Sequence, residues 1–459
     1  FSGDPVNGRS LAGITRRLGR MIDTELLKEK VLDLAMRGKL IYQSQEEYKF
    51  LERPQATTKE YSEMLSLIPN TWEIRYLNNI STSISITKKI KVKDIQSSGK
   101  YPVITQSANL VEGYYNNIEG LINVKNSIVI FGDHTLNVKY VDFDFLPGAD
   151  GIKLLLSNED ISDRFFYYLI SWASSKINRR GYARHFSLLK SYPLPIPSFS
   201  DQTVIKEFLD KAFKIIDHLA DQQDKFNNYQ KLVQDKALEL AMQGKLVPQL
   251  PEEGTAESLL VEVAVERQRL IDEKRIKKTK PLPEISEGEI PYEIPESWEW
   301  VRLGDILIEH IGGGTPSKKI PEYWDGDIPW CSIKDFHGDI LTTTRDTITE
   351  EGLKNSSSNL IQSGTLIVAT RLAVGKIMLA HIDIAINQDL RALIFGTSVN
   401  KAYIRYIYEK LNFVTQGVTV KGININNLLS ILLPFPPSNE QERIVNKLDE
   451  IDQALFSEN

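Results

Sequence analysis

The sequence predicts an α+β fold in which two α/β-mixed domains are separated by a pair of long antiparallel coiled-coil helices, with a pseudo-two-fold internal repeat. Three observations predict this fold. Segments of the chain occur twice in the same order. An apolar heptad pattern runs through the middle of the chain. Short strand-like and helix-like segments alternate on either side of it.

The repeat is carried by three pairs of matching segments. The matched pairs are 27–40 with 233–246, 68–73 with 294–299, and 195–210 with 434–449. They include a shared Gly-Lys-Leu ending, an Ile-Pro-x-x-Trp-Glu motif and a Pro-x-Pro motif followed by Gln. The intervening segments, 73–194 and 299–433, are unlike each other in sequence. We therefore predict two different domains attached to one repeated scaffold.

This pattern divides the chain into seven segments. We predict a tag at 1–20, the N-terminal half of a distal helix at 21–46, a first mixed domain at 47–197, a central coiled-coil helix at 198–250, a helix and linker at 251–293, a second mixed domain at 294–437, and the C-terminal half of the distal helix at 438–459. The first segment precedes the first methionine, Met21, and lacks clear periodicity, so we leave it out of the fold prediction.

The central helix is predicted from apolar residues that recur every three or four positions from Ile205 to Leu240. A long core helix of one large domain is the alternative, but the apolar stripe is narrow and its flanks are charged. Because the terminal segments match its two halves, we expect them to pack antiparallel against it. The residues expected to form this seam and to dock partners are Leu27, Leu34, Ile205, Phe208, Ile215, Leu219, Phe226, Val233, Leu240, Ile444, Leu448 and Ile451.

Each intervening segment is expected to mix strands and helices. The predicted strands are 121–124, 127–131, 364–369 and 389–395, and the predicted helices are 165–170 and 402–408. A further helix followed by a Pro- and Glu-rich linker is expected within 254–295.

Composition indicates a protein of the cytoplasm. The single cysteine, Cys331, cannot form an internal disulfide, and no apolar run approaches the ~18–20 residues of a membrane span. The net charge of -6 is unevenly distributed. Residues 73–197 hold 15 Lys and Arg against 11 Asp and Glu, whereas 198–298 hold 14 against 20. The first mixed domain is thus mildly basic, which is compatible with nucleic-acid binding.

No sequence motif nominates a catalytic or metal site. The Gly312–Lys319 stretch is rich in glycine but lacks the spacing of a phosphate-binding loop, and a flexible turn is the favoured interpretation. The six histidines are scattered, with no His or Cys pairs at metal-ligand spacing. We therefore expect no catalytic residue, no metal site and no cofactor on this chain.

The repeated motifs resemble the specificity subunits of type I restriction–modification systems. The Gly-Lys-Leu helices, the Ile-Pro-x-x-Trp-Glu and Pro-x-Pro motifs, the 312–334 stretch and the 417–424 loop all carry this resemblance, which covers 22–459. It implies that each mixed domain is a target recognition domain for half of a split double-stranded DNA site in a prokaryote. It also implies that the coiled coil sets the gap and binds two modification subunits. S-adenosylmethionine, ATP and Mg²⁺ would bind to the modification and restriction subunits only.

Base readout calls for Arg or Lys at guanine and Asn or Gln at adenine, on loops that face the groove. Phosphate contacts come from Lys, Arg, Ser and Thr. The DNA-binding candidates are Lys88, Lys89, Lys91, Arg179, Arg180 and Arg184 in the first domain, and Thr315, Ser317, Lys318, Lys319, Lys334, Arg371, Thr419 and Lys421 in the second. Two other functions stay open on sequence alone. One is an assembly scaffold that does not touch DNA, and the other is a nuclease with an unrecognised active site.

Overall fold

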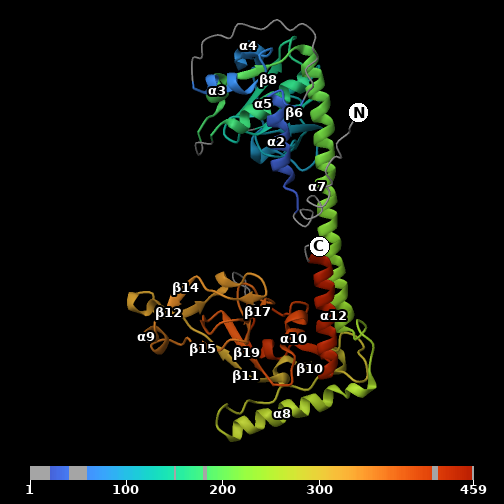
Figure 1. The fold of residues 1–459 in the computed structure, drawn as a ribbon, viewed down its shortest axis with the longest axis vertical. Coiled ribbons are helices and arrows are strands. Elements are labelled where there is room, and N and C mark those ends of the chain that lie inside the picture. Colours follow the sequence, from blue (N-terminus) through green and yellow to red (C-terminus); the bar gives the residue numbers. More distant parts are fainter. Residues whose placement is uncertain (1–20, 41–58, 149–150, 179–182, 416–421, 457–459) are drawn as a thin grey trace, which may run out of the picture. The chain divides into compact units, whose positions relative to one another are not determined.

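The computed structural model describes residues 21–40, 59–148, 151–178, 183–415 and 422–456 (Figure 1). These residues form two compact units, an N-terminal unit that extends to Phe226 and a C-terminal unit that begins at Asn227. The long helix α7 (Phe199–Met242) contributes its first part to the N-terminal unit and its last part to the C-terminal unit. The predicted mixture of helix and sheet with a long central helix is confirmed.

The described part of the N-terminal unit contains three sheets, of four, three and two strands, and several helices. Its helices are α2 (Thr24–Met36), α3 (Lys59–Leu67), α4 (Leu77–Ile80), α5 (Asp163–Lys176) and α6 (Phe186–Ser191). Its strands are β1 (Glu73–Arg75), β2 (Ser81–Ile84), β3 (Tyr101–Ile104), β4 (Gly113–Tyr115), β5 (Ile128–Gly132), β6 (Val138–Val141), β7 (Leu146–Pro147), β8 (Ile152–Ser157) and β9 (Leu194–Ile196). The 127–131 strand and 165–170 helix are confirmed, but 121–124 forms only an isolated bridge at Ile122.

The C-terminal unit repeats this plan with additions. Its helices after α7 are α8 (Ala256–Asp272), α9 (Glu350–Lys354), α10 (Lys401–Tyr408), α11 (Ile425–Leu429) and α12 (Ser438–Phe456). Its strands are β10 (Glu299–Arg302), β11 (Leu307–Gly312), β12 (Trp324–Cys331), β13 (Ile340–Leu341), β14 (Asp346–Ile348), β15 (Leu360–Ile361), β16 (Leu366–Ala369), β17 (Ile377–Ala380), β18 (Ile384–Ile386), β19 (Leu390–Phe395) and β20 (Leu432–Phe435). The strands predicted at 364–369 and 389–395 and the helix at 402–408 are confirmed.

The two mixed domains share one topology although their sequences differ. The larger sheet has the order β2-β8-β5-β6 in the N-terminal unit and β11-β19-β16-β17-β13 in the C-terminal unit. The smaller sheet has the order β4-β3-β7 and β14-β12-β18-β15, respectively, and in both cases its first pair is antiparallel and its second pair parallel. The internal repeat therefore extends through the segments that look unrelated in sequence.

Each terminal helix packs antiparallel on α7 within its own unit. In the N-terminal unit, the Ile22 amide donates to Gln223 over 3.1 Å and Lys28 forms an ion pair with Asp217 over 2.7 Å. In the C-terminal unit, Gln234 donates to Asp452 over 3.1 Å. Ile444 and Leu448 are buried in the same core cluster as Ala237, Leu238 and Ala241, and Ile451 packs against it.

The face of α7 that the chain itself covers differs from the predicted seam. The buried residues of the helix include Ile205, Leu209, Ile216, Ala237, Leu238 and Ala241. Four predicted seam residues are exposed instead: Phe208 at 38%, Ile215 at 69%, Phe226 at 59% and Val233 at 47%. Leu34 is 39% exposed, because α2 presents Leu32, Ala35 and Met36 to the core. The prediction that Leu34 docks on the central helix is therefore wrong, whereas Leu27, Leu219 and Leu240 are half-buried.

The repeated Gly and Trp motifs meet at one junction in each unit. Gly38 and Gly244 end their helices with φ of 67° and 66°, a conformation that favours glycine. A Cβ on either glycine would lie under 3.0 Å from the ring of Pro69 or Pro295, respectively. The Ile-Pro-x-x-Trp motif thus packs directly on the helix end, which explains why the two motifs recur together.

A buried glutamine joins the Pro-x-Pro motif to the mixed domain in each unit. Gln202 donates to the Pro197 carbonyl over 3.1 Å and accepts from the Ser162 amide at the start of α5. Gln441 donates to the Pro436 carbonyl over 2.9 Å and accepts from the Asn400 amide at the start of α10. The repeated residues therefore attach each domain to its helical scaffold through the same hydrogen bonds.

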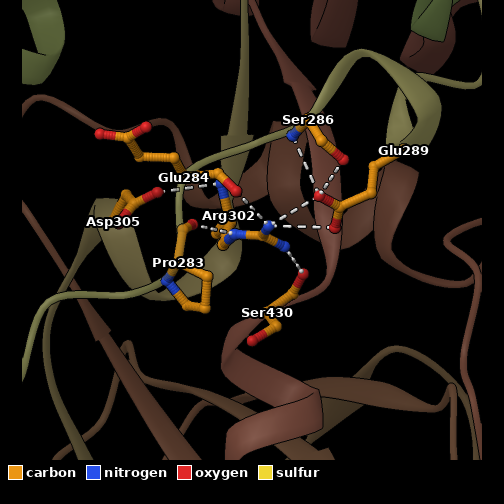
Figure 2. Close-up of polar contacts among 7 residues, drawn as sticks. All are labelled: Pro283, Glu284, Ser286, Glu289, Arg302, Asp305 and Ser430. Carbon is orange, nitrogen blue, oxygen red and sulfur yellow. Dashed lines mark hydrogen bonds and ion pairs between the residues drawn. The ribbon is translucent and has the colours of Figure 1, made fainter.

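The linker after α8 is anchored by one arginine (Figure 2). Arg302, only 4% exposed, donates to the carbonyls of Pro283, Glu284 and Ser430 and to both carboxylate oxygens of Glu289. The bonds that Glu289 accepts from the Ser286 backbone and from Arg302 lower its pKa to about 2. The Pro- and Glu-rich segment is thus tied to the C-terminal unit. No helix in the described ranges is both long and apolar enough to cross a membrane.

Candidate nucleic-acid interface

The topology of the C-terminal unit brings four loops to one edge of its sheets. Gly312, at the end of β11, pairs with Arg391 near the start of β19, and Ala369, at the end of β16, pairs with Leu390. In the smaller sheet, β12 and β18 run parallel and end together at Cys331 and Ile386. The segments after β11, β12, β16 and β18 therefore lie at what we call the C-terminal loop edge.

The N-terminal unit has an equivalent edge. Gly132, at the end of β5, pairs with Ile152 at the start of β8, and Ile84, at the end of β2, pairs with Leu154 on the same strand. β3 and β7 run parallel and end at paired residues, Ile104 and Pro147. The segments after β2, β3, β5 and β7 form the N-terminal loop edge.

Many of the predicted DNA-binding residues fall on these edges. Lys88, Lys89 and Lys91 follow β2, and the corresponding segment after β11 holds Thr315, Ser317, Lys318 and Lys319. Lys334 follows β12, Arg371 follows β16, and all of the residues named here from the C-terminal unit are exposed. Lysines on the surface of a loop suit phosphate contacts.

The segments near the end of each mixed domain, at residues 183–185 and 422–423, also reach these edges. In the C-terminal unit, Arg371 bridges to Gly422, and the Ile423 amide donates to the Thr370 carbonyl over 2.8 Å. In the N-terminal unit, the exposed residue Arg184 precedes His185, whose amide donates to the Asp133 carboxylate over 2.9 Å. The other candidates of these segments, Arg179, Arg180, Thr419 and Lys421, lie outside the described residues.

Side chains that sequence analysis missed organise the C-terminal loop edge. The Thr315 hydroxyl donates to the Gln388 side-chain carbonyl, and Gln388 in turn donates to Asp389 over 3.3 Å. Arg371 forms an ion pair with the other carboxylate oxygen of Asp389 at 3.4 Å. Three loops that are far apart in sequence thus form one connected set of polar groups. The only sequence signal for Gln388 and Asp389 was their position at the start of the strand predicted at 389–395.

The N-terminal loop edge holds a different set of polar groups at the same place. The His134 amide donates to the Gln106 side chain over 3.2 Å, and the backbone carbonyl of Gln106 accepts from Thr135 and Asn137. The His134 ring contacts the Ala183 carbonyl at 3.2 Å. Gln106 and His134 were also missed by sequence analysis, because neither belongs to a basic cluster.

The glycine run at the C-terminal loop edge packs closely against neighbouring chain. A Cβ on Gly313 would lie under 3.0 Å from the Ile386 and Asn387 carbonyls, and one on Gly314 under 3.0 Å from Ser357. The Gly314 amide also donates to the Ile386 carbonyl over 3.0 Å. The expected flexible turn is therefore wrong: these glycines allow the loop that carries Thr315 to lie directly against the end of β18.

The chemistry available at both edges is hydrogen bonding and charge. Arg, Lys, Gln, His and Thr offer donors and acceptors on exposed loops, the groups that read base edges and contact phosphates. The one thiol, Cys331, lies in the core, and burial raises its pKa well above the ordinary value for cysteine. The arrangement suits recognition of a polar, anionic ligand.

Comparison with known proteins agrees with this arrangement. Residues 69–226 and 295–458 each match the family described as the type I restriction modification DNA specificity domain. The specificity subunit of the type I restriction enzyme EcoR124I/EcoR124II of Escherichia coli is 28% identical over 394 residues, which cover 80% of this chain and 83% of the relative. The EcoEI specificity subunit of the same species is 24% identical over 92% of this chain and 88% of the relative.

A solved structure shares the fold. It is a chain from work on complex assembly and conformational transition of the type I R-M system, with a TM-score of 0.55 and 18% identity over 84% of this chain and 90% of that chain. The two family matches together cover more than half of the residues, and each contains one of the two mixed domains. The chain belongs to the type I restriction–modification DNA specificity family.

Proposed function

We propose that this chain is the DNA specificity subunit of a type I restriction–modification complex and that each loop edge reads one half of a bipartite site. The observation that supports this most directly is that two domains of one topology carry different polar groups on equivalent loops. A shared topology with different side chains is what two readers of two different half-sites require. A scaffold that does not touch DNA gives no reason for this difference.

The exposed apolar stripe of α7 supports a second part of the proposal. Phe208, Ile215, Phe226, Tyr229 and Val233 are all at least 38% exposed although they continue the heptad pattern. Large apolar side chains in a row on a helix suit a partner helix. We propose that two modification subunits dock here, and that restriction subunits join the assembly through them.

Catalysis is assigned to those partners in this proposal. The modification subunits would bind S-adenosylmethionine and methylate adenine, and the restriction subunits would use ATP and Mg²⁺ for translocation and cleavage. This chain would supply DNA recognition and no catalytic group. Its action on chromosomal DNA would place it in the prokaryotic cytoplasm.

The decisive experiment exchanges one domain in the whole complex. The chain is produced with its modification subunits, and methylated adenines are mapped by single-molecule sequencing of the host genome. Replacing residues 73–194 with the equivalent segment of a relative should change one half of the methylated motif and leave the other half unchanged. A change in both halves would contradict two independent readers, and an unmethylated genome with the unaltered chain would contradict the function itself.

A further inference from the structure

Asp389 is a fixed acidic group at the C-terminal loop edge. It is 9% exposed, its amide donates to the Asn387 side chain over 3.0 Å, and its carbonyl accepts from the Thr370 amide over 2.8 Å. Its carboxylate accepts from both Asn387 and Gln388 and faces Arg371. This carboxylate therefore orients two side chains that arise from different loops, Gln388 after β18 and Arg371 after β16.

The contacts of Gln388 leave a defined pair of hydrogen-bonding groups for a ligand. An amide side chain has two N–H donors and a carbonyl with two lone pairs. In Gln388, one N–H is bonded to Asp389 and one lone pair is bonded to the Thr315 hydroxyl. One donor and one acceptor remain on an exposed side chain whose amide orientation is set by these two bonds. A donor beside an acceptor is the combination that pairs with the N7 and N6 groups of adenine.

Arg371 leaves a second, different combination. Its side chain is 54% exposed, and only Nη1 approaches Asp389, at 3.4 Å. A guanidinium has five N–H donors, so most of them remain available on the exposed side. Two parallel donors pair with the O6 and N7 acceptors of guanine. The turn that follows Arg371 is tight, with Leu372 at a φ of 65°, and this turn presents the arginine at the edge of the sheet.

We propose that Gln388 reads an adenine and Arg371 reads a guanine in the major groove of the half-site bound by the C-terminal unit, with Asp389 as the positioning residue for both. This inference rests on the proposed function. The inference adds one base-reading residue, Gln388, and one positioning residue, Asp389. Neither carries a positive charge, so a search for basic residues would not identify them. The two reader side chains belong to one connected set, so their bases lie close together in the same half-site.

The test uses the chain assembled with its modification subunits. Gln388→Ala and Arg371→Ala are each expected to relax the methylated motif at one base pair of the same half-site. The relaxed position should differ between the two variants, and the other half-site should stay unchanged. In competition binding with base-substituted duplexes, discrimination at that base pair should fall roughly 5- to 150-fold.

Asp389→Asn tests the positioning role. It keeps the shape of the side chain but removes the charge that faces Arg371, so discrimination should fall at both base pairs while the thermal midpoint of the chain stays close to that of the unaltered protein. A purely structural role for Asp389 would lower the thermal midpoint and leave the ratio between competing duplexes unchanged.

Two matched controls lie on α8 in the same unit. Gln268 and Arg269 are exposed and bonded to acidic neighbours, Asp272 and Glu273, as the two readers are bonded to Asp389. Gln268→Ala and Arg269→Ala should leave the motif unchanged. The inference is overturned if Gln388→Ala and Arg371→Ala also leave every position unchanged, or if they weaken binding equally to all duplexes, as phosphate contacts would. The unaltered complex is tested in the same experiment. If it methylates a bipartite motif, the proposed function holds, and unchanged motifs in the variants contradict only the roles of Gln388 and Arg371.

Discussion

At the residue scale, one buried indole distinguishes the two halves of the repeat. Trp298 Nε1 donates to Glu440 over 2.8 Å, whereas the equivalent nitrogen of Trp72 is buried and has no hydrogen-bond partner within the described parts of the chain. The residue that corresponds to Glu440 is Asp201, whose side chain is one methylene shorter. A buried donor without a partner costs about 1–3 kcal/mol.

Lengthening this carboxylate should therefore stabilise the N-terminal unit. We expect Asp201→Glu to raise the free energy of unfolding by about 1 kcal/mol, because the longer side chain reaches the Trp72 indole. Urea denaturation monitored by tryptophan fluorescence would measure the change. The reverse substitution, Glu440→Asp, should destabilise the C-terminal unit by a similar amount, and a gain in stability there would contradict this explanation.

A buried lysine predicts a dependence of stability on pH. Lys139 on β6 is 6% exposed, and its amine donates to the carbonyls of Thr105 and Asn109. Burial lowers its pKa to about 8, from 10.5 in an unfolded chain. Between these values the unfolded state binds more protons than the folded state, so the free energy of unfolding should rise with pH.

The contribution of Lys139 can be isolated by substitution. The equivalent position in the C-terminal unit is Met378, which is 1% exposed. We expect Lys139→Met to remove a rise on the order of 3 kcal/mol between pH 8 and 10.5. Chemical denaturation of both proteins at several pH values would show the difference. Parallel curves for the two proteins would mean that Lys139 keeps an ordinary pKa in the folded chain.

At the element scale, burial separates two apolar residues of the terminal helices that the sequence places in the same seam. Ile444 on α12 is 0% exposed and packs in the core cluster, whereas Leu34 on α2 is 39% exposed. A buried aspartate without a partner costs several kcal/mol. We expect Ile444→Asp to lower the thermal midpoint strongly and to abolish assembly with modification subunits in size-exclusion chromatography. Leu34→Asp should leave the thermal midpoint nearly unchanged, and a collapse in that variant would show that Leu34 is packed in the assembled protein.

The glycine junction allows a second test at this scale. Gly38→Ala and Gly244→Ala should each lower the free energy of unfolding by more than ~1 kcal/mol, the effect expected from the positive φ alone. The loss should be larger because the added methyl group would also overlap a proline ring. Thermal denaturation would measure both. A loss below 1 kcal/mol would mean that the junction can move apart.

At the scale of elements, the long helices are predictable from the sequence, but the faces that they bury are not. The repeat and the heptads predict α7 and its two packing helices, because apolar periodicity is a local property. They do not predict which face is covered. One apolar face of α7 is packed within each unit, and another apolar face, which contains Phe208 and Ile215, is exposed. The residues of either face recur every three or four positions, so the spacing does not tell the two faces apart. The polar sets at the loop edges could not be predicted either, since Gln388 and Arg371 are brought together only by strand order.

At the scale of the whole molecule, the length of α7 is expected to set the spacing of the two half-sites. One heptad adds ~10 Å of helix, equivalent to about three base pairs. Residues 224–229 are exposed, which makes the position after Gln223 suitable for insertion. Inserting seven residues there should change the gap of the methylated motif and preserve both half-sites. An unchanged gap in the sequenced genome would mean that the partner subunits position the two domains.

The antiparallel packing of the terminal helices has a consequence for synthesis on the ribosome. Ile22 contacts Gln223 across 201 positions of sequence, and Gln234 contacts Asp452 across 218. Because α2 is synthesised before α7, it gains this contact only after residue 223 has been made, and α7 gains its contact with α12 later still. A chain that stops before residue 438 would hold the residues of the N-terminal unit but would lack Ile444 and Leu448, which share a core cluster with Ala237, Leu238 and Ala241. Apolar surface exposed in this way favours aggregation, so we expect a chain truncated at residue 437 to be less soluble than one that includes α12.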